Sequence, residues 1–238
     1  MRRSVVARCT EIRFTSAAGC VLSGAILEPE TDTPSGAGVV FVHGLWSDQS
    51  GGRARAAVVV DHLKTTAIAF DLSAHGESEG NAHEIQPFDH VLDVCAAMDL
   101  LVRDREVSEE RIGLCGSSYG SYIAGWVPAE RPTRSLLLRA PALHDDAVMS
   151  RSIAELTPTT ADVNAAEFFG RLEAYEGSAL VLESELDEVI PTAVVRAYLC
   201  HLKHAEHRII PGAGHRLSAA PEYEAIFGQE SVRWFAGL

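Results

Sequence analysis

The feature that most constrains the fold of this chain is a series of six short, almost wholly apolar runs that alternate with helix-like segments. The runs span residues 39–42, 67–70, 112–114, 136–138, 180–182 and 207–210, and the helix-like segments span 53–64, 85–103, 119–128, 193–202 and 222–235. Short runs that are apolar at nearly every position are typical of parallel strands buried on both faces. The alternation predicts an open, mostly parallel α/β sheet flanked by helices.

The N-terminal part of the chain has a different pattern. Residues 11–14 and 21–27 alternate well enough to predict a pair of antiparallel strands, and Pro29 and Pro34 then mark a loop. No internal repeat or long linker interrupts the rest of the sequence. We therefore expect one domain over residues 1–238, with a small cap inserted at about 142–177, after the sixth strand.

The charge balance excludes several kinds of partner. The chain has 20 Lys+Arg against 33 Asp+Glu, a formal net charge of −13, and its only basic cluster is Arg2, Arg3 and Arg8. Nucleic acids and anionic membranes attract basic stripes, so we expect neither as a partner. No apolar run approaches the roughly 18 residues of a membrane span, and the first 13 residues lack the apolar run of a signal peptide. Five widely spaced cysteines without a Cys-x-x-Cys pair predict free thiols, and together these features predict a cytoplasmic protein.

A glycine-flanked serine follows one of the predicted strands. In open parallel sheets, ligands bind at the carboxyl ends of the strands. There Gly116-Ser117-Ser118-Tyr119-Gly120 follows the run 112–114 and opens a helix, and only Ser118 has glycine two positions to either side. A serine on a sharp strand-to-helix turn needs those glycines because Cβ atoms would collide with the neighbouring elements. We predict that Ser118 is a nucleophile, the alternative being an ordinary glycine-rich turn.

A serine nucleophile requires a histidine base and a carboxylate that orients it. His215 lies on a glycine-rich loop just past the last apolar run. Acidic residues follow the run 180–182, at Glu183, Glu185, Asp187 and Glu188. Asp187, four residues before Pro191, is the favoured acid, and Glu185 remains the alternative.

Four blocks of sequence carry a resemblance to a known family. They are Val-Val-Phe-Val-His-Gly at 39–44, the block 71–78, the serine pentapeptide 116–120 and the block 184–191. The block 71–78 is similar to Asp-x-x-Gly-His-Gly-x-Ser with Ala74 in place of the first glycine, and 184–191 is similar to Gly-x-x-Asp-x-x-Val-Pro with Ser184 in place of glycine. Over residues 37–237 the chain resembles α/β-hydrolases, in particular the single-domain serine hydrolases of the monoacylglycerol lipase and serine aminopeptidase group.

The resemblance implies roles for individual residues. Ser118, Asp187 and His215 match the family's catalytic triad, and the acid block supports Asp187 over Glu185. The backbone N–H groups of Leu45 and Tyr119 match its oxyanion hole, and His43 and His75 belong to family turns with a structural role. The implied activity is hydrolysis of carboxylic esters through an acyl-enzyme, which needs neither a cofactor nor a metal.

The sequence is compatible with two other functions. The same triad could act as an amide or thioester hydrolase or as an acyltransferase, because it does not encode the leaving group. A more distant alternative is a non-catalytic binding module on the same fold. The expected partner is a small-molecule ester, and a homodimer is an option for the assembly.

The cap carries the candidate pocket residues. Phe168, Phe169, Leu172 and Tyr175 form an apolar helical stripe. The stripe indicates either packing against the sheet or a pocket wall, which Leu45, Trp46 and Leu143 could join. The candidate substrate-binding residues are therefore Trp46, Leu143, Phe168, Phe169 and Leu172. His201, His204 and His207 recur every three residues, but a helix ends and a strand begins between them, so we expect no metal site.

Overall fold

The computed structural model describes residues 7–31, 33–160 and 162–238. Arg2 and Arg3 of the basic cluster, and the first six residues of the segment compared with a signal peptide, lie outside the described residues. The strands are β1 (Arg8–Thr15), β2 (Val21–Glu28), β3 (Gly38–Val42), β4 (Thr66–Phe70), β5 (Ile112–Ser117), β6 (Ser135–Arg139), β7 (Ser178–Ser184) and β8 (Ala205–Ile210). The α-helices are α1 (Ser50–Leu63), α2 (Pro87–Arg105), α3 (Tyr119–Trp126), α4 (Ala166–Ala174), α5 (Thr192–His201) and α6 (Pro221–Phe235). Short 3₁₀ helices are η1 (Glu109–Arg111), η2 (Val127–Ala129), η3 (Asp146–Ser150), η4 (Ile153–Glu155) and η5 (Leu217–Ala219).

The eight strands form one sheet in the order β1-β2-β4-β3-β5-β6-β7-β8. β1 pairs antiparallel with β2, and β2 pairs antiparallel with β4. All other neighbouring pairs are parallel. The predicted N-terminal antiparallel pair and the predicted mostly parallel α/β sheet are therefore confirmed.

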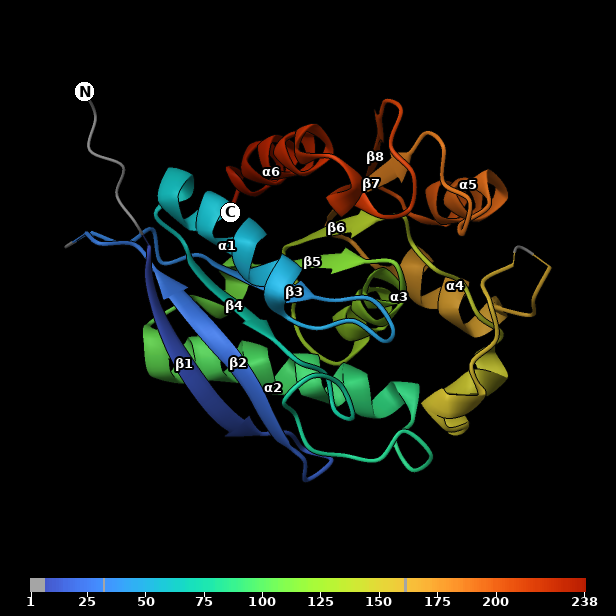
Figure 1. Cartoon of the computed structure of the whole chain (residues 1–238), viewed down its shortest axis with the longest axis horizontal. Helices are drawn as coiled ribbons and strands as arrows, with labels where there is room; N and C mark the ends of the chain where they lie inside the picture. The colour runs from blue at the N-terminus through green and yellow to red at the C-terminus, as the bar shows by residue number, and fades with distance from the viewer. Residues whose placement is uncertain (1–6, 32, 161) are drawn as a thin grey trace.

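Helices cover both faces of this sheet (Figure 1). One face packs against α1 and α6, through side chains such as Val59, Val60 and Phe227. The other packs mainly against α2 and α3, with α4 and α5 completing the layer. The central strands β3 and β4 are buried at every position, which explains why their runs are apolar throughout.

β8 departs from the prediction. The pattern of 207–210 predicts a strand buried on both faces, but β8 is one of the two edge strands of the sheet, opposite β1, and Ile210 is its only buried residue. Ile209 is 49% exposed, and His207 Nε2 pairs with Glu183 on β7 at 2.8 Å. Polar and charged side chains on an edge strand protect it from pairing with another chain. The first two residues of this run, His207 and Arg208, are polar, so half of the run does not match the pattern of a strand buried on both faces.

The segment between β6 and β7, for which a cap is predicted, packs on α3. It contains η3, η4 and α4, and the Asp146 carboxylate accepts hydrogen bonds from the Glu167 and Phe168 N–H groups at 2.7 and 3.1 Å. These two N–H groups belong to the first turn of α4, where backbone donors otherwise lack partners. Phe168 and Leu172 are fully buried, and the Phe168 ring lies 5.5 Å from that of Trp126 on α3.

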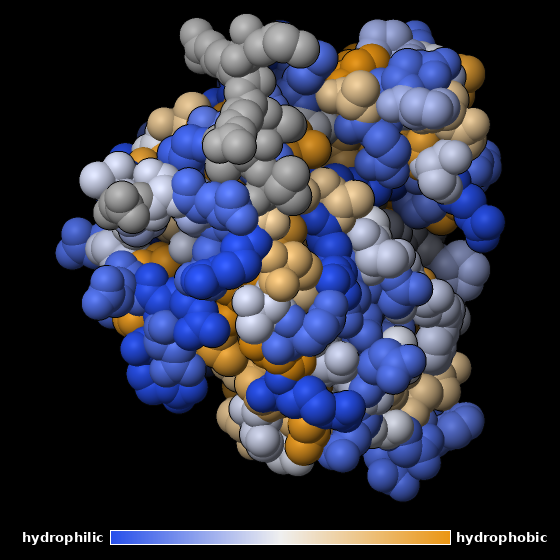
Figure 2. All heavy atoms as spheres, turned by 60° about the vertical axis from the view of Figure 1, so that its left-hand side comes forward, coloured by the Kyte–Doolittle hydropathy of each residue, from blue (hydrophilic) through white to orange (hydrophobic). Residues whose placement is uncertain are grey.

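The surface of the β1–β2 side is mixed. Figure 2 shows hydrophilic side chains over much of this side, with smaller apolar patches between them. Across 7–31, 33–160 and 162–238, no helix is long and apolar enough to cross a membrane. All five cysteines are free thiols.

Replacing Phe168 with Ala should destabilise the protein by about 3–5 kcal/mol, because the ring is fully buried between α3 and α5 and its loss leaves a cavity. The neighbouring Phe169 is a matched control, since it is half-buried and stacks on His201 with ring centroids 4.2 Å apart. Phe169→Ala should cost less than half as much. Urea denaturation of the two variants measures the difference, and equal losses would contradict the burial of Phe168.

Candidate active site

The strand order reverses at β3, and this places two candidate functional loops next to each other. β3 lies between β4 and β5 and is parallel to both. The chain from β3 continues to α1 and β4 on one side, whereas β5 and the later strands extend on the other. Ligands in open α/β sheets bind at such a switch point. The loop after β3, which contains Leu45, and the turn after β5, which contains Ser118, therefore share one crevice.

Ser118 sits in a strained turn between β5 and α3. Its backbone has φ 55° and ψ −120°, outside the regions that L-residues normally occupy. A Cβ on Gly116 would lie 2.6 Å from the backbone N of Ser121, and one on Gly120 would overlap the Val42 carbonyl oxygen. The predicted need for glycine at both positions is confirmed, because a Cβ at either one would collide with the backbone of a neighbouring segment.

His215 and Asp187 are hydrogen-bonded to each other. Nδ1 of His215 lies 3.0 Å from both carboxylate oxygens of Asp187, whose side chain is 5% exposed. The N–H groups of Val189 and Ile190 also donate to Asp187 Oδ1, at 2.9 and 2.8 Å. Burial alone would raise the pKa of Asp187, but the hydrogen bonds from His215, Ile190 and Val189 lower it below its usual value. Asp187 is thus held as a carboxylate facing the imidazole.

The other acidic residues of this loop bind backbone groups. Glu185 Oε2 accepts from the Gly212 N–H at 2.7 Å, and Glu188 Oε2 accepts from the His215 N–H at 3.2 Å. Both contacts attach the acid loop to the loop that carries His215. The structure therefore places Asp187, and not Glu185, against the imidazole.

Ser118 and His215 line the same cavity, of about 540 Å³, together with Leu45, Trp46 and Arg139. Within the described part of the chain, the Ser118 hydroxyl and His215 form no hydrogen bond with each other. Hydrogen bonds between catalytic groups are often long in unliganded sites and shorten when substrate binds. The structure brings the two groups to one cavity and joins only His215 and Asp187 directly.

Two backbone N–H groups beside Ser118 lack protein acceptors. Tyr119 is the first residue of α3, so its N–H points out of the helix start, and Leu45 lies in the turn after Gly44. Among the described residues, neither N–H donates to another protein group. Free donors at a helix start favour an anionic oxygen.

Buried histidines support the loop that carries Leu45. His43 Nδ1–H donates to the Gly44 carbonyl at 2.8 Å, and His43 Nε2 accepts from the Leu72 N–H at 3.0 Å. The His75 ring stacks on Trp46 with centroids 5.4 Å apart. Burial lowers the pKa of His43 to about 4, so the ring stays neutral and keeps both hydrogen bonds.

A second buried histidine links this support to Tyr119. His90 Nε2–H donates to the Ser73 carbonyl at 3.0 Å, and the Tyr119 hydroxyl donates to His90 Nδ1 at 2.9 Å. Burial lowers the pKa of His90 to about 3. In the adjoining turn, Ala74 has φ 59°, a left-handed backbone that explains why glycine is usual at this position of the resembling family.

The candidate pocket residues fall in different places. Trp46, which is 60% exposed, lines the Ser118 cavity. Leu143 lines a separate cavity of about 250 Å³ within the cap. Phe168 and Leu172 are fully buried in the packing of α4, and neither they nor the half-buried Phe169 lines the Ser118 cavity.

Sequence reasoning missed Arg139, the last residue of β6. This side chain is 5% exposed, lines the Ser118 cavity and donates hydrogen bonds to the loop of His215. The available signal was a single charge at the end of the apolar run 136–138. A buried charge at that position requires polar partners and so marks a candidate functional position.

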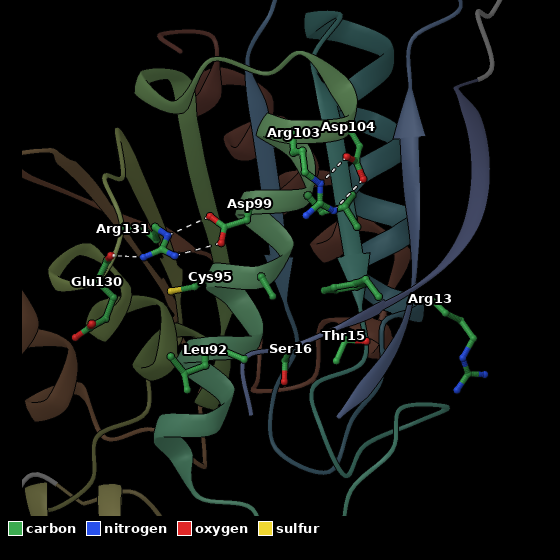
Figure 3. A pocket seen from close by; sticks show the side chains of 14 residues that line it. Arg13, Thr15, Ser16, Leu92, Cys95, Asp99, Arg103, Asp104, Glu130 and Arg131 are labelled. Carbon is green, nitrogen blue, oxygen red and sulfur yellow. Dashed lines mark hydrogen bonds and ion pairs between the residues drawn. The ribbon is translucent and has the colours of Figure 1, made fainter. Parts of the chain in front are cut away.

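A second cavity, of about 530 Å³, lies between the end of β1 and α2 (Figure 3). Arg131 faces Asp99 there, with hydrogen bonds of 3.1 and 3.2 Å, and Arg103 faces Asp104. These charges neutralise each other. In the described ranges, no three His, Cys, Asp or Glu side chains gather into a metal-binding group, and His201 instead pairs with Glu173 at 2.7 Å.

Comparisons with known proteins agree with this fold. The model of the family described as "Serine aminopeptidase, S33" matches residues 33–169, more than half of the chain. No curated protein sequence matches the chain.

Many solved structures share the fold. The α/β hydrolase GrgF from Penicillium sp. sh18 has a TM-score of 0.74 and 15% identity, covering 96% of this chain and 98% of that one. Acetyl xylan esterase 1 from Thermoanaerobacterium sp. JW/SL YS485 has a TM-score of 0.71 and 18% identity, covering 98% and 84%. An esterase from Pyrococcus furiosus has a TM-score of 0.70 and 17% identity, covering 96% and 92%.

Stability should fall when the pH drops from 7 to 5, in part because of His90. Its pKa is about 3 in the folded protein and about 6.5 in the unfolded chain, so only the unfolded state takes up this proton between those values. His90→Gln should remove about 1–2 kcal/mol of the loss between pH 7 and 5. Urea denaturation of both proteins at each pH measures the difference.

Comparing the two proteins removes the contributions of the other groups. One of these is Asp93, whose pKa burial raises to about 6 and whose contribution has the opposite sign. An equal pH dependence in wild type and His90→Gln would contradict the assignment of a neutral, buried His90.

Proposed function

The chain belongs to the serine aminopeptidase family of α/β-hydrolases and is a serine hydrolase, and from this premise we propose that it cleaves carboxylic esters of small to medium size through an acyl-enzyme. In this proposal Ser118 is the nucleophile, His215 the general base and Asp187 the residue that orients it. The backbone N–H groups of Leu45 and Tyr119 form the oxyanion hole.

One observation supports this proposal above the others. Ser118, held in a strained strand-to-helix turn, shares a cavity with His215. Nδ1 of this histidine is hydrogen-bonded to the buried carboxylate of Asp187 at 3.0 Å. Backbone strain that persists in a folded protein concentrates at functional sites. A non-catalytic binding module has no need for the carboxylate or for the strained serine.

Each residue has a defined step in the proposed reaction. His215 Nε2 takes the Ser118 hydroxyl proton as Oγ attacks the ester carbonyl, and Asp187 stabilises the resulting imidazolium. The tetrahedral intermediate collapses, the C–O bond to the alcohol breaks, and His215 returns the proton to the leaving oxygen. Water then attacks the acyl-enzyme with His215 again as base, which releases the acid and restores Ser118.

The oxyanion hole would supply much of the rate enhancement. Negative charge develops on the carbonyl oxygen in both tetrahedral intermediates, and Leu45 and Tyr119 offer N–H donors that no other protein group uses within the described ranges. Loss of one such donor typically costs about 2.7–4 kcal/mol of transition-state stabilisation. Because both donors are backbone groups, side-chain substitutions leave them in place.

The cavity and the similar proteins support the choice of substrate. A cavity of about 540 Å³ accommodates a small or medium-sized ester. Two of the similar solved structures are an acetyl xylan esterase and another esterase. We further propose a cytoplasmic location, because free thiols are typical of a reducing compartment.

Amide hydrolysis is the second candidate, because the matching family is described as a serine aminopeptidase. The same triad could also act on thioesters or transfer the acyl group to an acceptor. Turnover of short nitrophenyl esters, the corresponding thioesters and amino-acyl anilides, compared under one condition, separates these activities. Faster turnover of the anilides than of the esters would favour the aminopeptidase.

Ser118→Ala should abolish both labelling by a fluorophosphonate probe and hydrolysis of a short nitrophenyl ester, with a loss of about 10⁴-fold or more. The control is Ser117→Ala, which removes the neighbouring hydroxyl and should leave labelling intact. Mass spectrometry of the labelled peptide identifies the modified serine. The mechanism is wrong if wild type is not labelled, or if hydrolysis survives in Ser118→Ala.

Asp187→Asn should lower kcat by about 10⁴-fold, because an amide cannot hold the imidazole in the tautomer that accepts the serine proton. Glu185→Gln is the matched control, since its amide oxygen can still accept from the Gly212 N–H. Steady-state kinetics with one ester compares the variants. A larger loss in Glu185→Gln than in Asp187→Asn would reassign the acid.

A further inference from the structure

Arg139 is a buried cation at the centre of the site. It ends β6, its side chain is 5% exposed, and it lines the cavity that contains Ser118 and His215. Burial lowers the pKa of Arg139 to about 10, so the guanidinium remains charged at neutral pH. No carboxylate contacts it directly among the described residues, which distinguishes it from Arg55, paired with Glu224 at 2.8 Å in the same cavity.

Arg139 contacts all three segments that carry the proposed triad. Its backbone carbonyl accepts from the Ser118 N–H at 2.8 Å. Its Nη2 donates to Ser184 Oγ at 2.9 Å, on the strand that leads to the acid loop. The same nitrogen donates to the carbonyl oxygens of Gly214, at 3.2 Å, and of His215.

We propose that Arg139 is a positioning residue for this triad, because its guanidinium fixes the backbone of His215 relative to Ser118 and the acid loop. The inference rests on the proposed function, since it assigns a task to a residue of the same site. Three contacts then define the placement of His215. Glu188 accepts from its N–H, Arg139 donates to its carbonyl, and Asp187 binds Nδ1. In the described structure Nε2 carries no hydrogen bond, so it remains free to act on Ser118.

The chemistry of arginine suits this task. All three side-chain contacts come from Nη2, whose two N–H groups are fixed in the guanidinium plane and are shared among the three acceptors. A lysine ammonium is instead a compact charge on a flexible stem. Hydrogen bonds from a charged donor are stronger than neutral ones, and carbonyl acceptors partly offset the cost of burying the cation. The acceptor on β7 is Ser184, at the position where the resembling family's acid block has glycine. Glycine has no hydroxyl, so this contact depends on the serine.

Substitution combined with chemical rescue tests the proposal. Arg139→Gly should lower kcat for a short nitrophenyl ester by about 100-fold, the loss typical of a displaced catalytic group, with little change in KM. Guanidinium chloride at tens of millimolar should restore a substantial part of kcat, because the ion can occupy the vacated space beside the cavity. Sodium chloride at the same concentration should not.

Two further variants keep the test decisive. Arg131→Gly removes an arginine that pairs with Asp99 in the other cavity (Figure 3), and its activity should be normal and insensitive to guanidinium. If Arg139→Gly does not fold, as judged by circular dichroism, Arg139→Lys tests the proposal. It retains the charge but not the planar donors, and it should also lose kcat at constant KM.

The outcomes that overturn the proposal are specific. Wild-type kcat in the Arg139 variants, or a folded Arg139→Gly without guanidinium rescue, would remove the positioning role. A rise in KM at unchanged kcat would make Arg139 a substrate contact instead. These results are distinct from failure of the proposed function, in which wild type itself lacks Ser118-dependent hydrolysis and fluorophosphonate labelling.

Discussion

The contact on which the rest of the site depends is the direct approach of α3 to the end of β3. Gly120 lies so close to the Val42 carbonyl that any side chain there would overlap it. This approach brings the turn of Ser118 beside the loop of Leu45, so the proposed nucleophile after β5 and the proposed N–H donor after β3 reach one cavity. The cost is backbone strain at Ser118, typically about 1–3 kcal/mol for such a conformation. Hydrogen bonds on both sides of Ser118, to Arg139 and from Ser121 and Ala142, hold the turn in place.

The acid loop shows how one short segment serves several purposes. From Glu183 to Glu188 its four acidic side chains reach four different partners: the His207 ring, the Gly212 N–H, the His215 ring and the His215 N–H. Three of these contacts join the acid loop to the loop that carries His215, and the fourth joins β7 to the edge strand. Much of the negative charge in this segment is therefore used in fixed hydrogen bonds and is not simply a solvated acidic patch.

Much of the fold and the geometry of the proposed triad could be predicted from the sequence, because both leave local patterns. An apolar run indicates that its own strand is buried. Glycines at 116 and 120, within one pentapeptide, indicate that the backbone there lies close to neighbouring segments. The role proposed for Arg139 could not be predicted in this way. Its hydrogen-bond partners lie 45 to 76 positions away in the sequence, and no local pattern indicates them. The edge position of β8 is also set by the order of the whole sheet, and the polar residues His207 and Arg208 are a local sign of it. Likewise, the apolar stripe of α4 fitted either packing or a pocket wall until its neighbours on α3 were known.

The turn at Ala74 has a consequence for how this sequence can vary. Alanine has no intrinsic preference for φ 59°, and a left-handed backbone costs a residue with a Cβ about 1–2 kcal/mol. The turn keeps this shape because its surroundings impose it, through the Ala74 N–H to the Glu79 carbonyl at 2.8 Å and the Asp71 carboxylate, which accepts from the Gln49 and Glu77 N–H groups. The backbone conformation at position 74 is therefore determined by tertiary contacts and not by the preference of alanine. A residue other than glycine can thus occupy this position while the loop beside the proposed active site keeps its form.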